Sequence, residues 1–143
     1  MKLLLAIDGS EFSQAATRVV IAQFRPPDTE VKVLNVVNNT EYLDYPAGVT
    51  EDQLNQAREL VNRASQKLRT AGFKVESAVC RGEAREGIID SAEEWHADLI
   101  VLGSHGRTGL GRFLLGSISD AVIRHARCSV EIVRFIQGKD QES

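Results

Sequence analysis

The sequence has few cysteines, no excess of positive charge and no long apolar run, and each of these absences excludes a class of protein. Its two cysteines, Cys80 and Cys128, form no CxxC pair, so we expect free thiols in a reducing compartment. The net charge of −3 at pH 7 provides no field for a phosphate backbone and argues against general nucleic-acid binding. No segment approaches the roughly 20 apolar residues of a membrane-spanning helix. The first apolar run stops at Asp8, too early for a signal peptide. We therefore predict a cytoplasmic protein that binds neither nucleic acid nor membrane.

Length and composition indicate one folded domain. The chain has 143 residues, of which 43% are hydrophobic and 26% charged, as is usual for soluble globular domains. We expect a single domain over residues 1–143, with a long loop at about 38–50, a glycine-rich loop at 103–117 and a flexible tail at about 137–143.

Hydrophobic periodicity predicts an alternation of strands and helices. Residues 3–7 and 99–102 are apolar throughout, which is typical of central strands covered on both faces. Further strands are predicted at 31–37, 73–79 and around 130–132, and the alternating pattern of 73–79 favours an edge position. Helical spacing predicts helices over about 10–25, 51–71, 84–95 and from about 116 or 117 onward. In the last helix the predicted buried residues are Leu114, Leu115, Ile118, Ala121 and Val122. The alternation indicates an α/β fold, an open doubly wound parallel sheet with helices on both faces.

The same pattern predicts where a ligand binds. In open parallel sheets, ligands bind beyond the carboxyl ends of the strands where the winding direction reverses. Asp8 comes directly after the apolar run at 3–7, and Gly103 comes directly after the run at 99–102. These runs are the two most apolar of the predicted strands. The loops after these strands are therefore the predicted pocket.

The loop that starts at Gly103 is rich in glycine, with further glycines at 106, 109 and 111 before the final helix. Glycines let backbone N–H groups converge on an anion, and a helix N-terminus adds unpaired donors and partial positive charge. Arg107 and Arg112 are placed to supplement them. The pattern predicts a phosphate site. No GxxxxGK[ST] motif and no dinucleotide fingerprint is present, which argues against P-loop and NAD-binding proteins.

A simpler interpretation needs no ligand. The run from Ser117 to Asp120 has the form of a capping box, with Ser117 as N-cap and Asp120 reaching back. Similarly, Asp8 at a strand end has the chemistry of a cap for the following helix. A histidine in a glycine-rich loop, such as His105, is more often solvated than chemically active.

The spacing Gly103-x2-Gly106-x9-Gly116-Ser117 resembles the G-x2-G-x9-G-[ST] signature of the ATP-binding branch of the universal stress protein family. The stretches at 7–10, 34–37 and 125–128 are also similar to the family's, so the resemblance covers nearly the whole chain. It implies a five-stranded sheet in the order 3-2-1-4-5, a three-layer sandwich of the adenine nucleotide alpha hydrolase-like type.

The resemblance also implies binding residues for ATP, with Mg²⁺. Those matching the phosphate-holding positions are Gly103, Gly106, Gly116, Ser117, Ile118 and Ser119. Those matching the adenosine pocket are Ala6, Ile7, Asp8 and Val36. His105 and Arg107, from the glycine-rich loop, are further candidate binding residues. Asp8 is also the candidate to orient the ribose or a metal-bound water. The resemblance further implies a homodimer through the last strand, at about 129–136. The chain departs from the family's pattern here: Arg127 and Ser129 stand where the family commonly has prolines, and Glu131 lies in that strand.

Three functions remain open at this stage. The first is a regulatory, stress-response nucleotide binder with little or no turnover, because the loop has no lysine and no acidic cluster is available to hold Mg²⁺ firmly. The second is a slow ATPase or phosphotransferase using Asp8 with His105 or Arg107. The third is a nucleotide-free interaction module, in which Gly106→Val and Gly116→Val alter stability alone. No GxSxG elbow supports a hydrolase.

Overall fold

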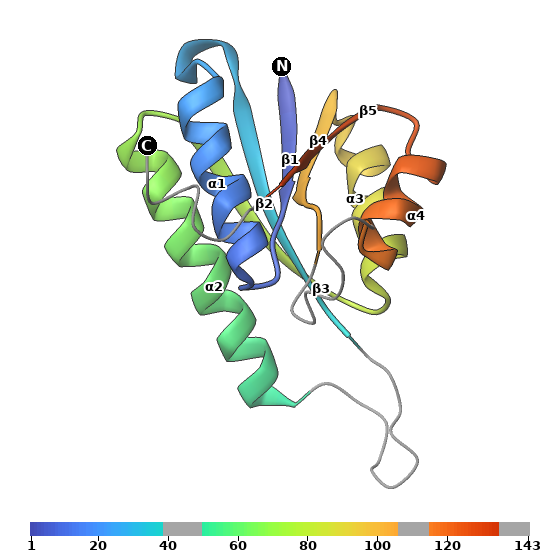
Figure 1. Ribbon diagram of the computed structural model, residues 1–143. Helices are drawn as coiled ribbons and strands as arrows, with labels where there is room; N and C mark the ends of the chain where they lie inside the picture. Colours follow the sequence, from blue (N-terminus) through green and yellow to red (C-terminus); the bar gives the residue numbers. More distant parts are fainter. Residues whose placement is uncertain (39–49, 106–114, 135–143) are drawn as a thin grey trace, which may run out of the picture.

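The computed structural model describes residues 1–38, 50–105 and 115–134, and its centre is a five-stranded parallel sheet (Figure 1). The strands are β1 (Lys2–Ala6), β2 (Glu30–Val37), β3 (Lys74–Arg81), β4 (Leu99–Gly103) and β5 (Ser129–Val133). The helices are α1 (Glu11–Gln23), α2 (Glu51–Thr70), α3 (Ala84–Trp95) and α4 (Ser117–His125), with a 3-10 turn at Pro26–Asp28. The strand order is β3-β2-β1-β4-β5 and all pairs are parallel. The predicted fold class and strand order are confirmed.

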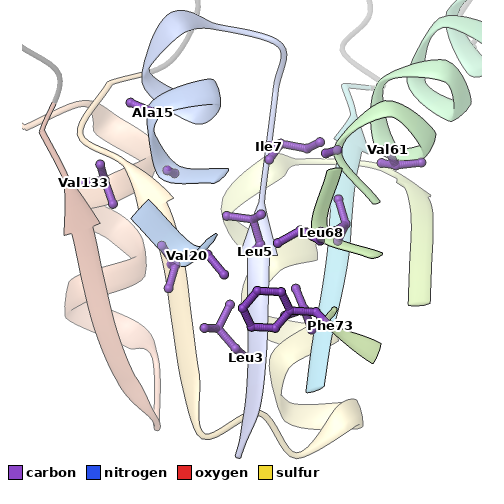
Figure 2. Packing of buried hydrophobic residues seen from close by; sticks show 14 residues of the cluster. Leu3, Leu5, Ile7, Ala15, Val20, Val61, Leu68, Phe73 and Val133 are labelled. Atoms are coloured by element: carbon purple, nitrogen blue, oxygen red, sulfur yellow. The ribbon is translucent and has the colours of Figure 1, made fainter. Parts of the chain in front are cut away.

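The sheet is covered by helices on both faces, with α1 and α2 on one side and α3 and α4 on the other (Figure 1). Because strand side chains alternate between the faces, β1 supplies both cores. Leu3, Leu5 and Ile7 pack toward α1 and α2, where they meet residues such as Val20 and Leu68 (Figure 2).

On the opposite face, Leu4 of β1 packs with Ile88 of α3 and Val122 of α4. Leu3, Leu4 and Leu5 are fully buried, and each such side chain stabilises the fold by about 1.5–3 kcal/mol. This double burial explains why the run is apolar throughout.

Local signals set the helix ends. Ser10 caps α1 by accepting a hydrogen bond from the Ser13 amide, and Thr50 forms a capping box with Gln53 at the start of α2. The chain leaves α2 through Gly72, whose φ of +101° favours glycine. The first helix ends at Gln23, slightly before its predicted end at 25, because Phe24 is already extended.

The final helix differs from its prediction at one position. Ala121 and Val122 are buried, and Ile118 packs against the same cluster. Leu115 lies before the helix and is 44% exposed, so its prediction as a buried residue is wrong. The apolar spacing continues before the N-terminus of α4, which begins at Ser117. Leu114, the loop at 39–49 and the predicted tail at 137–143 lie outside the described residues.

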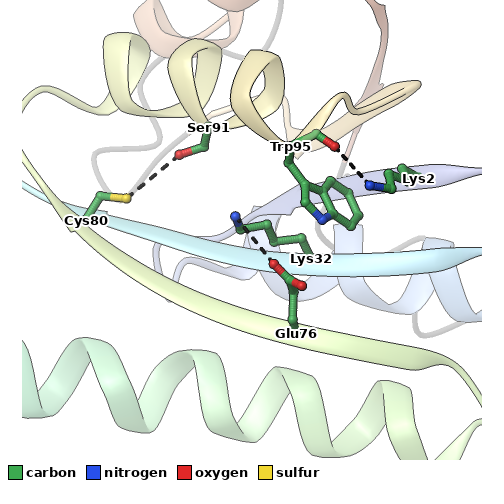
Figure 3. A network of polar contacts seen from close by, with 6 residues as sticks. All are labelled: Lys2, Lys32, Glu76, Cys80, Ser91 and Trp95. Atoms are coloured by element: carbon green, nitrogen blue, oxygen red, sulfur yellow. Dashed lines mark hydrogen bonds and ion pairs between the residues drawn. The ribbon is translucent and has the colours of Figure 1, made fainter.

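A polar network joins the strands to α3 (Figure 3). The Lys2 ammonium donates to the Trp95 carbonyl at 3.3 Å and lies 5.1 Å from the centre of the indole ring. Lys32 lies 5.9 Å from the same ring and pairs with Glu76 at 3.5 Å. These contacts attach β1, β2 and β3 to the end of α3. Both cysteines are free thiols, as predicted. No helix within the described ranges is long and apolar enough to span a membrane.

Candidate functional site

A pocket opens at the carboxyl ends of β1 and β4, where the sequence predicts a ligand. It contains about 480 Å³ of space, which includes open solvent at its mouth. Its lining comes from every strand except the two edge strands and from the adjoining helices. The lining residues are Ala6, Ile7, Asp8, Ser13, Leu34, Val36, Ala84, Ile88, Leu102, Gly103, His105, Ile118 and Ser119.

The turn after β1 is held by its own side chains. One Asp8 carboxylate oxygen, Oδ1, accepts a hydrogen bond from the Ser10 amide at 2.9 Å, and Gly9 supplies a φ of +84°. Ser10 is the N-cap of α1. The interpretation of Asp8 as a cap is therefore wrong in detail, because Asp8 orders the turn two residues before the capping residue, Ser10.

The end of β4 is fixed by a chain of backbone hydrogen bonds. The Ser104 amide donates to the Val133 carbonyl at 2.8 Å, and the Ser104 carbonyl accepts from the Gly116 amide at 2.7 Å. The Ser119 hydroxyl donates to the Gly103 carbonyl, also at 2.7 Å. These bonds attach the start of α4 to the end of β4, so the helix N-terminus is held beside the pocket.

Gly116, not Ser117, is the N-cap of α4, and it makes no side-chain capping bond. The predicted capping box from Ser117 to Asp120 is wrong, because Ser117 is already the first helical residue and the Asp120 carboxylate accepts from Arg124 instead. The Gly116 amide donates its hydrogen bond to the Ser104 carbonyl. The amides of Ser117, Ile118 and Ser119 have no intrahelical acceptor, as is general for a first helical turn, and make no hydrogen bond to the described residues.

His105 is packed rather than solvated. Its Nδ1 lies 3.0 Å from the Ser104 hydroxyl, and its ring lies 5.1 Å from the ring of Phe12. Its Nε2 is buried and has no hydrogen-bond partner among the described residues. The expectation of a solvated loop histidine is wrong for this residue, and its Nε2 is left available for a group in the pocket.

The universal stress protein family model matches residues 1–134. The chain belongs to the universal stress protein family. It is 31% identical over 138 residues to Universal stress protein MJ0531 of Methanocaldococcus jannaschii, covering 93% of this chain and 81% of that protein. It is 33% identical over 137 residues to a putative universal stress protein of Staphylococcus aureus strain USA300, covering 92% and 82%.

Solved structures agree with the fold of this universal stress protein. Hypothetical protein MJ0577 has a TM-score of 0.83 and 29% identity, with 96% of this chain and 97% of that chain covered. A universal stress protein from Archaeoglobus fulgidus in complex with dAMP has a TM-score of 0.71 and 24% identity, covering 93% and 97%. A universal stress protein in complex with cAMP has a TM-score of 0.68 and 22% identity, covering 93% and 96%.

The structure of this universal stress protein brings most of the predicted site residues into one pocket. Those that line it are Ala6, Ile7, Asp8, Val36, Gly103, His105, Ile118 and Ser119. Gly116 and Ser117 lie at the start of α4 but do not line the pocket. Gly106 and Arg107, like Arg112, lie outside the described residues.

Sequence reasoning missed five lining residues, four of which are apolar. The missed residues are Ser13, Leu34, Ala84, Ile88 and Leu102. Two signals were available. Leu34 precedes Val36 by two residues and so shares its face of β2, and Ala84 and Ile88 are one helical turn apart on α3. What the sequence did not contain is which face of α3 turns toward the sheet end.

Within residues 1–38, 50–105 and 115–134, no group of three or more His, Cys, Asp or Glu side chains is arranged to hold a metal ion. Asp8 contributes the only carboxylate among the lining residues that the structure describes.

Proposed function

We propose that this universal stress protein binds an adenine nucleotide, ATP with Mg²⁺, in the pocket at the ends of β1 and β4, as a regulatory stress-response module with little or no turnover. The observation that carries the proposal is the pairing of two chemically different halves in one pocket. Val36, Ala84 and Ile88 form an apolar half that suits a base. The first turn of α4 presents unpaired amides that suit phosphate.

Other universal stress proteins support the choice of nucleotide. Solved structures with this fold are complexes with dAMP and with cAMP. Both ligands combine an adenine base with a phosphate, as the two halves of this pocket require. The preference for ATP comes from the resemblance of the glycine spacing between Gly103 and Ser117 to the signature of the family's ATP-binding branch.

The described lining residues fit Mg²⁺ only when the phosphates of the nucleotide supply further ligands to the metal. Mg²⁺ usually keeps several waters and is held by one or two carboxylates together with substrate phosphates. Asp8 would hold it through a water, since one of its oxygens already accepts from the Ser10 amide. The metal would neutralise phosphate charge.

Little turnover is expected because the described lining lacks a catalytic set. It includes no lysine or arginine, one carboxylate and one histidine. The Nδ1 of that histidine, His105, lies beside the Ser104 hydroxyl. Magnesium-dependent release of ADP, measured with wild type and His105→Ala, tests the alternative of a slow ATPase or phosphotransferase. A rate near 1 s⁻¹ that is lost in the variant would establish that alternative.

Binding itself is tested by calorimetric titration of ATP with Mg²⁺ into wild type, Ala84→Phe and Arg85→Phe. Both variants place phenylalanine in the first turn of α3, but Ala84 lines the pocket and Arg85 is exposed. We expect saturable binding by wild type and Arg85→Phe and at least about tenfold weaker binding by Ala84→Phe, equivalent to about 1.4 kcal/mol. Equal affinities in all three would place the nucleotide elsewhere. No binding at all by folded wild type would leave a nucleotide-free interaction module.

We also propose a cytoplasmic homodimer through the last strand. The Val133 carbonyl points to Ser104 at the end of β4, so the alternate residues Val130 and Ile132 direct their backbone groups to the open edge. Val130→Pro removes one of these donors and Val130→Ala retains it. Sedimentation should show a dimer that Val130→Pro weakens and Val130→Ala retains. A monomer at all concentrations would contradict the proposal.

A further inference from the structure

The second edge of the sheet, β3, carries a groove of its own on the side that faces α2. It contains about 810 Å³ of space, which includes open solvent above the groove. Leu54 and Val61 of α2, both buried, form the floor together with Val79 of β3. The rim carries Arg58 from α2 and Arg81 from β3, both exposed. No acidic residue lines the groove among the described residues.

The backbone of β3 determines which of its groups are open. The Gly82 amide donates to the Val37 carbonyl of β2 at 2.9 Å, and the β2–β3 register is continuous from Lys74 to Arg81. Backbone groups alternate between the two sides of a strand. The N–H and C=O groups of Val75, Ser77, Val79 and Arg81 therefore point away from β2, toward the open edge.

Among the residues that the structure describes, contacts block only the first part of this edge. The Arg69 guanidinium donates to the Val75 carbonyl at 3.2 Å, a common way to blunt an edge strand. The backbone groups of Ser77, Val79 and Arg81 make no hydrogen bond to the described residues. These same three residues line the groove. The open half of the edge and the groove thus form one surface.

We propose that this surface, the open edge of β3 with its groove against α2, binds an extended acidic segment of a partner protein by strand addition. Backbone pairing to Ser77, Val79 and Arg81 would supply affinity, and alternate side chains would enter the groove. Arg58 and Arg81 select acidic side chains at its rim. The surface lies on a different strand from the nucleotide pocket, so the inference does not depend on nucleotide binding.

The charges disfavour a second copy of the chain as the occupant. A second copy would bring the same groove, which carries Arg58 and Arg81 and no acidic residue among its described lining residues. Opposite charges on paired strands stabilise the pair, whereas like charges destabilise it. An acidic segment instead brings opposite charge to both arginines.

The probe is a seven-residue peptide whose odd positions, which share one face of a strand, are glutamate, valine, valine and glutamate, with threonine at the even positions. It is compared with the same peptide carrying lysine in place of each glutamate. Binding to wild type is followed by fluorescence anisotropy and by amide hydrogen exchange. We expect the acidic peptide alone to bind saturably and to slow exchange at Ser77, Val79 and Arg81. The amides of Ala78 and Cys80, which face β2, should already exchange slowly.

One matched pair of variants and one double variant separate the backbone contribution from the charge contribution. Ser77→Pro removes an outward N–H without touching the β2 ladder, whereas Ser77→Ala keeps it. The acidic peptide should bind Ser77→Ala as tightly as wild type and Ser77→Pro about tenfold more weakly. The double variant Arg58→Glu with Arg81→Glu should lose at least as much affinity for this peptide as Ser77→Pro does. Circular dichroism checks that each variant folds.

Three results would overturn the proposal: no saturable binding of the acidic peptide at millimolar concentration, equal binding by Ser77→Pro and Ser77→Ala, or equal binding of the lysine peptide. Dimerisation of wild type that Ser77→Pro abolishes would identify a second copy as the occupant and overturn it as well.

Discussion

Gly103 and Phe12 approach so closely that a Cβ atom on Gly103 would lie 2.6 Å from the Cβ of Phe12 and 2.8 Å from its carbonyl carbon. Gly103 ends β4, and Phe12 lies in the first turn of α1. The glycine therefore lets α1 settle against the end of the central strands. This packing role accounts for Gly103 whether or not a phosphate binds nearby.

Gly103→Ala should lower the free energy of unfolding by about 1–3 kcal/mol, because the added methyl group overpacks a rigid contact. Phe12→Ala should not rescue it, since the Cβ and backbone of residue 12 remain. Urea denaturation of the two single variants and the double variant measures both effects. Wild-type stability in Gly103→Ala, with loss of ATP affinity alone, would contradict the packing role.

Much of the fold could be predicted because its signals are local. The apolar runs in β1 and β4 follow from burial on both faces, and Pro26 and Gly72 mark helix ends through backbone restrictions. The error at Leu115 has the opposite cause. Its spacing fits the α4 stripe, but the Gly116–Ser104 hydrogen bond holds the chain to the end of β4 and starts the helix later.

The polar half of the pocket was easier to predict than the apolar half. Glycines, Asp8 and His105 are uncommon enough in a loop to be noticed, and they follow strands that end at one edge. Ala84 and Ile88 are ordinary helix residues whose role depends on how α3 is rotated against the sheet. That rotation is set by long-range packing, which a single sequence does not display.

Ser119→Ala should reduce stability, because the buried Ser119 hydroxyl donates to the Gly103 carbonyl at 2.7 Å. Leaving that buried acceptor without its donor costs about 1–3 kcal/mol. Ser117→Ala is the matched control, since Ser117 is exposed in the same helical turn, and it should change stability by less than about 0.5 kcal/mol. Chemical denaturation of both variants gives the comparison, and equal losses would mean that the Ser119 bond is not the cause.

Cys128 should react slowly with iodoacetamide at neutral pH. Burial, and to a smaller extent the nearby Asp98 carboxylate, raise the pKa of the Cys128 thiol above its ordinary value. The neutral thiol is therefore favoured in the folded state. The stability that the folded state gains from the neutral Cys128 thiol is fully present at pH values below the pKa of the unfolded thiol. It is lost as the pH rises through the higher pKa of the folded thiol.

The Cys128 prediction is measured in a Cys80→Ser background, so that one thiol remains. Labelling of the native protein should be slower than labelling in urea and should accelerate only above the pH at which the unfolded thiol reacts. Asp98→Asn should accelerate it modestly, because burial is the larger cause. Native and unfolded protein reacting at the same rate at pH 8 would contradict the prediction.

Gly87 and Val36 form the contact by which α3 reaches the apolar end of the pocket. A Cβ on Gly87 would lie 2.8 Å from Cγ2 and 3.0 Å from Cγ1 of Val36, so here the obstacle is a side chain. Valine has little freedom to rotate away. Gly87→Ala should therefore destabilise the fold by about 1–3 kcal/mol despite the better helix propensity of alanine.

Val36→Ala removes the two methyl groups that obstruct the added Cβ, so the double variant should regain part of the stability lost in Gly87→Ala. The two changes should show a favourable coupling of about 1 kcal/mol in a double-mutant cycle measured by urea denaturation. No such recovery is expected at Gly103, where the obstacle includes the backbone of Phe12. Additive losses of stability at Gly87 and Val36 would mean that α3 shifts as a unit to accommodate the methyl group. A change in ATP affinity in Gly87→Ala would then reflect the displaced helix and not a displaced Val36.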